Sequence, residues 1–297
     1  MALELIAPAK VNLTLEILGK RPDGYHEIAS VMQTIDLADR VRLERANDIE
    51  LHVGGVTAAG VPADPARDLA YRAAVALRNE GGRALGARIG LEKRIPAGMG
   101  LGGGSTDAAA VLRGLDRLWG LDLGTERLSR VAADLGSDVP FFLHGGAALS
   151  TGRGEVTAPL PDVAPVDLTL FMSDVDAEDK TRRMYAEISP VDYTDGFRTR
   201  ELAERLRKGA VLNELDLRNA FDPHIGALAR SVVRAMMMCL DGGLSVIAAG
   251  SGPAFFALIR RDELAARLLE DIERECGVRV VGARTLTRAE SLAAVEV

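Results

Sequence analysis

A cluster of glycines followed by hydroxyls is the most unusual stretch of this sequence. Residues 94–110 read RIPAGMGLGGGSTDAAA, and five of the seven residues from 98 to 104 are glycine. Bare backbone N–H groups can converge there, and Ser105 adds a hydroxyl near the start of an expected helix, where an anion is favoured. Because glycine costs the most conformational entropy on folding, a plain turn is a poor reason for so many. The stretch therefore predicts a phosphate-binding loop.

Three other interpretations of this loop are less favoured. From Gly98 it fits G-x-G-x-x-G, but that dinucleotide fingerprint follows a continuously apolar parallel strand. Here the preceding segment 87–95 alternates apolar and polar residues, and Pro96 intervenes. No lysine follows the glycines, as a Walker A loop would require. A flexible turn with Ser105 as an ordinary N-cap remains an alternative, whereas a nicotinamide dehydrogenase is disfavoured.

A lysine and an asparagine stand in an alternating segment near the N-terminus. Ala7, Ala9, Val11, Leu13 and Leu15 share one face of an expected strand, which places Lys10 and Asn12 together on the other. Only five of the 36 basic residues are lysine, so each lysine invites a question about its role. The alternative is an ordinary lysine on a solvated strand face.

Asp138 is the matching acidic candidate. It lies in GSDVPFFLHGG (136–146), between a Gly-Ser turn and an apolar run, where partial burial beside a basic group is expected. Its alternative role is that of a capping or Asx-turn aspartate. Beside a phosphate loop, Lys10 and Asp138 suggest a pair that acts on a substrate hydroxyl.

The elements that must position these residues follow from hydrophobic periodicity. Strands are expected at 41–53, 87–95, 166–174, 277–287 and, with a turn, within 244–261. Helices are expected at 68–80, 105–119, 125–135 and 262–275. These elements predict an α+β chain with mostly antiparallel sheets, and Gly- and Pro-rich text at 150–165 indicates a junction between domains 1–155 and 156–297.

Composition limits the classes of partner. The net charge of −7 argues against nucleic acid or an anionic membrane as the main partner. The two cysteines, Cys239 and Cys276, form no CxxC motif and no metal-ligand spacing, which favours a reducing cytoplasm. No signal peptide and no apolar run of about 18 residues is expected, so we predict a soluble, cytoplasmic protein. The sequence says nothing about the oligomeric state.

Four motifs together resemble the GHMP kinase superfamily. They are PAKVNL (8–13), RIPAGMGLGGGSTDAA (94–109), GSDVPFF (136–142) and AAGSGPAFFAL (248–258). Within the superfamily, residues 8–28 and the triple glycine resemble the branch that phosphorylates the 2-hydroxyl of a cytidylyl sugar alcohol in the non-mevalonate isoprenoid pathway. The resemblance implies an N-terminal α/β domain like the ribosomal protein S5 domain 2 and a C-terminal ferredoxin-like α+β domain.

The same resemblance implies roles for the candidate residues. Asp138 would be the catalytic base, and Lys10 would orient it and stabilise developing charge. The phosphates of ATP would be wrapped by Pro96, Ala97, Gly98, Met99, Gly100, Leu101, Gly102, Gly103, Gly104, Ser105 and Thr106. Mg²⁺ is expected as a cofactor, with Ser105 or Thr106 as candidate ligands and no ligand assigned.

A cytidine site is implied as well. Tyr25 and Tyr185 match the positions whose rings stack on cytosine, and His26 matches the position that hydrogen-bonds the edge of the base. Asn12 and Thr181 match further substrate-binding positions. For Tyr185 the alternative is ordinary helix packing, whereas the turn signal PDG before Tyr25 and His26 makes core packing less natural for that pair.

Four residues depart from the family pattern. Thr106 and Asp107 stand where the loop usually has Ser and Asn, Asp68 stands where an Asn is associated with the ATP side, and Ala254 stands where a small hydroxyl residue is common. A carboxylate at 107 would repel a triphosphate unless it faces away or meets Mg²⁺. A homoserine or mevalonate kinase of the same superfamily and a non-catalytic nucleotide-binding module remain as alternatives.

Overall fold

Two long antiparallel strands, β1 (Ala2–Lys20) and β2 (His26–Ala46), form the centre of the larger of two sheets. The computed structural model describes residues 2–58, 61–82, 85–173, 180–227, 230–259 and 263–296. The register between β1 and β2 shifts at Pro8–Lys10 and again at Asn12–Thr14. Such bulges re-aim side chains locally, and here they flank the segment that carries Lys10 and Asn12.

The larger sheet has the strand order β12-β1-β2-β4-β3, with β5 paired to β2, β6 to β5 and β8 to β1. The added strands are β3 (Ile49–Gly54), β4 (Gly86–Glu92), β5 (Ala147–Gly152), β6 (Val156–Pro159), β8 (Arg218–Asn219) and β12 (Ala294–Glu296). All these pairs are antiparallel except β3–β4 and β1–β8. The expected predominance of antiparallel pairs is therefore confirmed.

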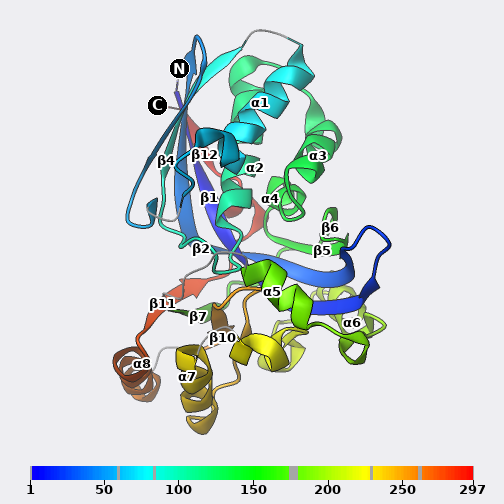
Figure 1. Ribbon diagram of the computed structural model, residues 1–297, viewed down its shortest axis with the longest axis vertical. Helices are drawn as coiled ribbons and strands as arrows, with labels where there is room; N and C mark the ends of the chain where they lie inside the picture. The colour runs from blue at the N-terminus through cyan, green and yellow to red at the C-terminus, as the bar shows by residue number, and fades with distance from the viewer. Residues whose placement is uncertain are drawn as a thin grey trace.

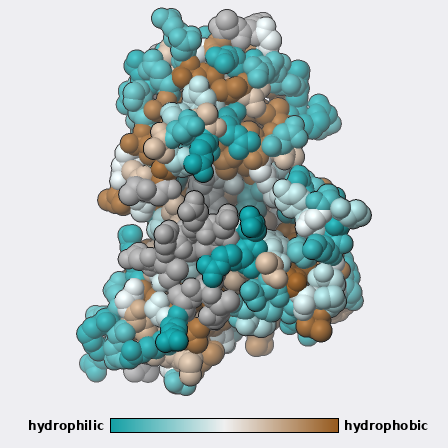
Figure 2. All heavy atoms as spheres, viewed as in Figure 1, coloured by the Kyte–Doolittle hydropathy of each residue, from teal (hydrophilic) through white to brown (hydrophobic). Residues whose placement is uncertain are grey.

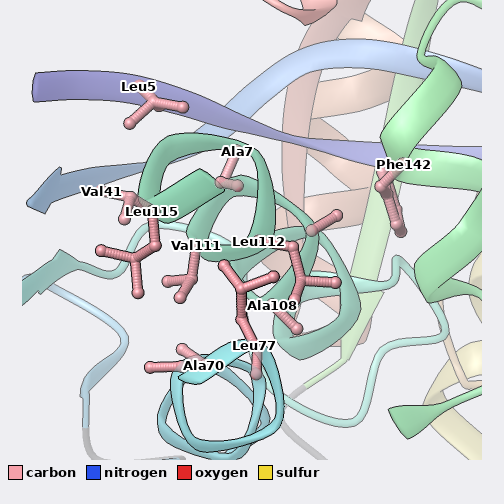
Figure 3. Packing of buried hydrophobic residues seen from close by; sticks show 14 of the residues in the cluster. Leu5, Ala7, Val41, Ala70, Leu77, Ala108, Val111, Leu112, Leu115 and Phe142 are labelled. Atoms are coloured by element: carbon pink, nitrogen blue, oxygen red, sulfur yellow. The ribbon is translucent and has the colours of Figure 1, made fainter. Parts of the chain in front are cut away.

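Four helices pack on the larger sheet and on one another (Figure 1). They are α1 (Leu69–Gly81), α2 (Gly103–Trp119), α3 (Gly124–Leu135) and α4 (Val139–His144). Figure 3 shows α2 between the strands and α1, with Val111 and Leu115 toward the sheet side and Leu77 of α1 on the opposite side. Because α2 is covered on two sides, it is rich in buried alanine and leucine, and its first turn is held rigidly.

The smaller sheet has the strand order β11-β7-β10-β9 and lies below the larger one in Figure 1. Its strands are β7 (Asp167–Ser173), β9 (Ile247–Ala248), β10 (Phe255–Ala257) and β11 (Val278–Arg284). The remaining helices are α5 (Lys180–Glu187), α6 (Phe197–Arg207), α7 (Arg230–Asp241), α8 (Glu263–Cys276) and α9 (Arg288–Ser291). Short 3₁₀ turns occur at 65–67, 190–192, 214–216 and 222–227.

Most elements expected from periodicity are present, although several of their ends shift by up to three residues, as in β4, which ends at Glu92 and not at residue 95. The segment 41–53 is not one strand: β2 ends at Ala46 and β3 begins at Ile49, because the chain bends at Asn47–Asp48. Helix α2 begins at Gly103, two residues before the expected start, so two glycines lie in its first turn.

The proposed division at residue 155 stays a prediction. It falls just before β6, which pairs with β5 of the larger sheet, and the chain returns to that sheet at β8 and β12.

The surface is that of an ordinary folded chain. Figure 2 shows hydrophilic side chains over most of the viewed face, with hydrophobic ones in smaller groups. Within the described ranges no helix is long and apolar enough to cross a membrane.

Candidate active site

A buried chain of hydrogen bonds begins at Lys10 on β1. The Lys10 ammonium donates to Asn12 Oδ1 at 2.6 Å, and Asn12 Nδ2 donates to Ser30 Oγ of β2 at 2.6 Å. Ser30 in turn donates to the carbonyl of Thr14 at 2.6 Å. Lys10 is 4% exposed and Asn12 is fully buried, so the solvated strand face considered for Lys10 is wrong. These hydrogen bonds fix the position of the Lys10 ammonium.

Asp138 lies beside this ammonium, as the sequence led us to expect. Its Oδ2 is 3.9 Å from Lys10 Nζ, and its side chain is 31% exposed, which leaves it accessible to a ligand. Burial lowers the pKa of Lys10, and the charge of Asp138 partly opposes that effect. Asp138 precedes α4 but forms no side-chain cap hydrogen bond, so the simple capping role is not what the structure shows. One buried cation and one accessible carboxylate thus share a site.

The glycine loop crosses β1 at this point. The backbone N–H of Lys10 donates to the carbonyl of Leu101 at 3.0 Å. Met99 and Leu101 are buried in the core, whereas the backbone at Gly98, Gly100 and Gly102 has positive φ values of 70°, 78° and 77°. The apolar side chains anchor the loop, and the alternating glycines supply the left-handed backbone that other residues adopt only with strain.

A second glycine loop packs against the first. The N–H of Asn12 donates to the carbonyl of Ala249 at 3.0 Å, and a Cβ on Gly250 would lie 2.9 Å from Lys10 Nζ. Asn219 of β8 holds this loop, since its Nδ2 donates to the carbonyls of Ala248 and Gly250. Sequence reasoning assigned no function to this second loop, although AAGSGPAFFAL was noted as a motif.

The N-terminus of α2 presents unpaired N–H groups next to the loop. The first helical hydrogen bond runs from Thr106 N to the carbonyl of Gly102 at 2.9 Å, which leaves the N–H groups of Gly103, Gly104 and Ser105 free of helical partners. Gly102 is the N-cap and no side chain caps the helix, so Ser105 is not an ordinary N-cap. A phosphate is the expected ligand of such a terminus.

The hydroxyls of Ser105 and Thr106 differ in their fit to a metal ion. Ser105 is half-buried in the first turn, whereas Thr106 is 1% exposed within the packed face of α2. Within the described ranges no group of three or more His, Cys, Asp or Glu side chains is placed to hold a metal. Of the two candidate hydroxyl residues, Ser105 is therefore the more accessible at the phosphate loop.

A buried ionic cluster holds both ends of the glycine loop, and sequence reasoning missed it. Lys93 donates to Asp39 of β2 and to Asp107 of α2. Asp39 also accepts the N–H groups of Arg94 and Ile95, the latter at 2.8 Å. Asp107 is therefore buried against the Lys93 ammonium, which offsets the repulsion of a triphosphate that the sequence raised for a carboxylate at this position. The scarcity of lysine was the one sequence signal for Lys93.

Burial and the neighbouring charges in this cluster shift the pKa values of Asp107 and Lys93. Burial raises the pKa of Asp107 to about 8; Lys93 opposes the shift, and Asp39 and Asp68 add to it. Burial acts to lower the pKa of Lys93, but the two carboxylates outweigh it, so this pKa is raised. The Oδ1 atom of Asp107 is buried and has no hydrogen-bond partner in the described part of the chain. The single Lys93 ammonium is thus the shared ionic partner of two buried carboxyl groups, those of Asp39 and Asp107.

The other two departures have simple structural roles. Asp68 is the N-cap of α1, and its Oδ1 accepts the N–H of Ala70 at 2.8 Å, as an Asn would. Ala254 is fully buried, and its carbonyl accepts the N–H of Ala249 at 2.9 Å within the second glycine loop.

The aromatic residues cluster, but not as a facing pair of tyrosines. His26 stacks on Tyr185 of α5, with ring centroids 5.2 Å apart and an interplanar angle of 24°. Tyr185 also meets Phe221 edge-on at 4.9 Å. Burial, with a contribution from Asp138, raises the pKa of Tyr185, which links this cluster to the acidic residue. Burial also lowers the pKa of His26, with a contribution from Lys20, so its ring is mainly neutral near pH 7.

Tyr25 stands apart from that stack. It is 54% exposed, and the guanidinium of Arg153 lies 4.8 Å from its ring centroid. Thr181 is exposed at the start of α5 and meets Ser251 of the second glycine loop through a hydroxyl contact of 3.4 Å. The structure therefore brings Lys10, Asn12, Asp138 and the loop together, and it places the aromatic residues around this centre.

Comparison with known proteins identifies the fold and the class of protein. Residues 68–146 match the family model described as GHMP kinases N terminal domain. A crystal structure of 4-(cytidine 5'-diphospho)-2C-methyl-D-erythritol kinase superposes with a TM-score of 0.76 at 34% identity, covering 95% of this chain and 98% of that one. A homoserine kinase from Cytophaga hutchinsonii superposes with a TM-score of 0.75 at 18% identity, which shows the shared fold. The α+β GHMP kinase fold is thus confirmed, and the chain is a small-molecule kinase that uses ATP.

Curated relatives narrow the class further. A protein of Listeria innocua serovar 6a named 4-diphosphocytidyl-2-C-methyl-D-erythritol kinase is 37% identical over 286 residues, covering 93% of this chain and 94% of its own length. A protein of the same name from a Synechococcus species is 40% identical over 289 residues, covering 91% and 89%. The chain belongs to the 4-diphosphocytidyl-2-C-methyl-D-erythritol kinase family.

Proposed function

We propose that this chain transfers the γ-phosphate of ATP to the 2-hydroxyl of 4-diphosphocytidyl-2-C-methyl-D-erythritol, a step of the non-mevalonate isoprenoid pathway. The observation that carries the proposal is the pairing of buried Lys10 with accessible Asp138 beside two interlocked glycine loops. Full-length relatives with this activity in their names support the choice of substrate.

Asp138 is the proposed general base. Its carboxylate takes the proton of the substrate hydroxyl, the hydroxyl oxygen forms a bond to the γ-phosphorus, and the bond from that phosphorus to the bridging oxygen breaks, so that ADP leaves. Lys10, held by Asn12 and 3.9 Å from Asp138, orients that carboxylate and stabilises the charge that develops in the transfer. Phosphoryl transfer depends mainly on positioning and charge stabilisation, so few reactive side chains are required.

The glycine loop, residues 96–106, is the proposed site for the ATP phosphates. The free N–H groups at the N-terminus of α2 and the bare backbone at the glycines are the donors. Ser105, a half-buried residue, would hold Mg²⁺ through its hydroxyl, with the remaining ligands from phosphate and water. When bound, the ion would neutralise charge on the triphosphate.

The cytidine end is assigned to the aromatic cluster. Tyr25 and Tyr185 are the proposed stacking faces, and His26 is the proposed hydrogen-bond partner of the base. Because His26 stacks on Tyr185, a cytosine that stacks on Tyr185 would displace or extend that contact. Asn12 and Thr181 are the proposed polar contacts of the sugar alcohol. The cytoplasmic location expected from the sequence stays a prediction.

An ADP-release assay tests the function. Purified chain is given ATP and Mg²⁺ with the cytidylyl substrate, homoserine or mevalonate as the acceptor, and Asp138→Asn is the inactive control. We expect ADP release that depends on the cytidylyl substrate alone. Faster release with homoserine or mevalonate would reassign the chain to another branch of the superfamily, and no release with any acceptor would indicate a non-catalytic module.

A further inference from the structure

Arg153 lies at the tip of the hairpin between β5 and β6, beside the turn that joins β1 to β2 (Figure 1). The tip is tightly built: Glu155 accepts the N–H of Arg153 at 2.6 Å, and Gly154 donates to the carbonyl of Thr151 at 3.0 Å. Gly154 has a φ of 112°, which favours glycine there. The hairpin therefore presents the Arg153 side chain from a defined backbone.

Arg153 stands between two parts of the proposed site. Its guanidinium lies 4.8 Å from the ring centroid of Tyr25, the proposed face for cytosine. Its neighbour Gly154 borders the proposed base, since a Cβ there would lie 3.8 Å from Asp138 Oδ1. In a cytidylyl sugar alcohol the group between the cytidine and the reacting hydroxyl is the diphosphate.

The guanidinium of Arg153 also has N–H groups without a hydrogen-bond acceptor in the described part of the chain. Among the described residues its one ion contact is to Glu155 at 3.7 Å, which is longer than a hydrogen bond. Nearby Arg21 is different, because Glu27 at 2.6 Å and Asp23 at 3.2 Å already occupy its guanidinium. Lys10 is likewise committed to Asn12 and Asp138. A planar guanidinium with unused donors matches phosphate oxygens in a bidentate way.

We propose that Arg153 binds the diphosphate of the cytidylyl substrate and is a specificity-determining residue of this kinase. The inference rests on the proposed function, and it goes beyond it by naming the group that distinguishes a nucleoside diphosphate from a nucleoside at this site. Arg153 takes no part in proton transfer, so its loss affects substrate binding rather than the rate of the bound complex.

Calorimetric titration with cytidine 5'-diphosphate and with cytidine separates this role from a structural one. The variants are Arg153→Gln, Arg153→Lys and the matched control Arg21→Gln, and thermal unfolding checks that each is folded. For Arg153→Gln we expect a 10- to 100-fold loss of affinity for the diphosphate, the range of a hydrogen bond to a charged group, with cytidine affinity within about threefold of wild type. Arg153→Lys should retain part of the preference, and Arg21→Gln should retain it fully.

Kinetics give an independent readout. Arg153→Gln should raise KM for the cytidylyl substrate with little change in kcat, and added salt should weaken wild type more than the variant. Equal losses for cytidine and its diphosphate would overturn the inference, because Arg153 would then act only through Tyr25. If wild type turns over the cytidylyl substrate while Arg153→Gln keeps the preference for the diphosphate, the inference alone fails. A wild-type chain that neither binds the diphosphate nor turns over the substrate overturns the proposed function as well.

Discussion

Replacing Asp107 by Asn should stabilise this protein, and the gain should grow with pH. Asp107 is 2% exposed, its Oδ2 accepts from Lys93, and its Oδ1 is buried without a partner in the described chain. Asp39 also accepts two backbone N–H groups, so it is the more firmly placed partner of the same Lys93 ammonium. An Asn at 107 keeps the shape and an acceptor for Lys93, and it cannot ionise.

The sign of the pH effect follows from proton binding. Burial raises the pKa of Asp107 from 3.8 to about 8 in the folded chain. Between these two values the folded chain holds a proton that the unfolded chain has released, so folding stability falls as pH rises through that window. From pH 5 the folded carboxyl stays protonated until about pH 7 and is half ionised at pH 8, while the unfolded one is ionised throughout. At about 1.36 kcal/mol per pKa unit, roughly two and a half of these three pH units are effective, which corresponds to a loss of about 3 kcal/mol.

Chemical unfolding of wild type and Asp107→Asn at pH 5, 7 and 8 measures this loss. Other groups that titrate in the window are common to both chains and cancel in the difference between the two free energies of unfolding. We expect the advantage of Asp107→Asn to be about 3 kcal/mol larger at pH 8 than at pH 5.

The matched variant is Asp39→Asn, which places an amide N–H against the Lys93 ammonium and should destabilise the chain by about 1–3 kcal/mol at pH 5. An Asp107→Asn advantage that does not change with pH would refute the reasoning, and so would a loss of stability at pH 8.

The remaining predictions concern catalysis and binding. Asp138→Asn should lower kcat by about 10²- to 10⁴-fold with ATP still bound, and near-normal turnover would remove Asp138 from the mechanism. Gly102→Val should abolish ATP binding in calorimetry, because a Cβ there would lie 2.7 Å from the Phe142 ring on a backbone with φ of 77°; Gly120→Val, with φ of 66° and open space, controls for backbone strain alone. Tyr25→Ala and Tyr185→Ala should each raise KM for the cytidylyl substrate about 10- to 100-fold, the loss of one stacking face, with ATP affinity unchanged; unaltered KM in both would mean that the rings only pack.

Elements with strong local patterns were predictable from the sequence. The helices at 68–80, 105–119 and 125–135 follow from the spacing of their apolar residues, and the structure has α1, α2 and α3 at these places. The bend at Asn47–Asp48 was not predicted, because the alternation of apolar residues continues across it. Periodicity indicates which side chains are buried, but it does not indicate where the chain leaves one strand and begins another with a different pairing partner.

The features that the sequence did not predict depend on contacts between residues that are far apart in the chain. The alternation around Lys10 left a solvated face as an alternative, but the second glycine loop, near residue 250, covers it. The pairing of Lys93 with Asp39 joins residues 54 positions apart, and no local pattern marks either one. By contrast, the position of Asp138 beside a basic group followed from its placement between a turn and an apolar run.

Because the two glycine loops are in close contact, the geometry of the site depends on how the two sheets are placed relative to each other. A Cβ on Gly100 would lie 2.7 Å from the backbone nitrogen of Gly252, so neither loop can approach the other with a side chain in place. One loop leads into α2 on the larger sheet, whereas the other joins β9 to β10 of the smaller sheet. Strand β1 hydrogen-bonds both loops, through the N–H groups of Lys10 and Asn12. Phosphoryl transfer requires the acceptor hydroxyl and the γ-phosphate to be aligned. A substitution that loosens the contact between the two loops should therefore reduce activity before it unfolds the core beside either sheet.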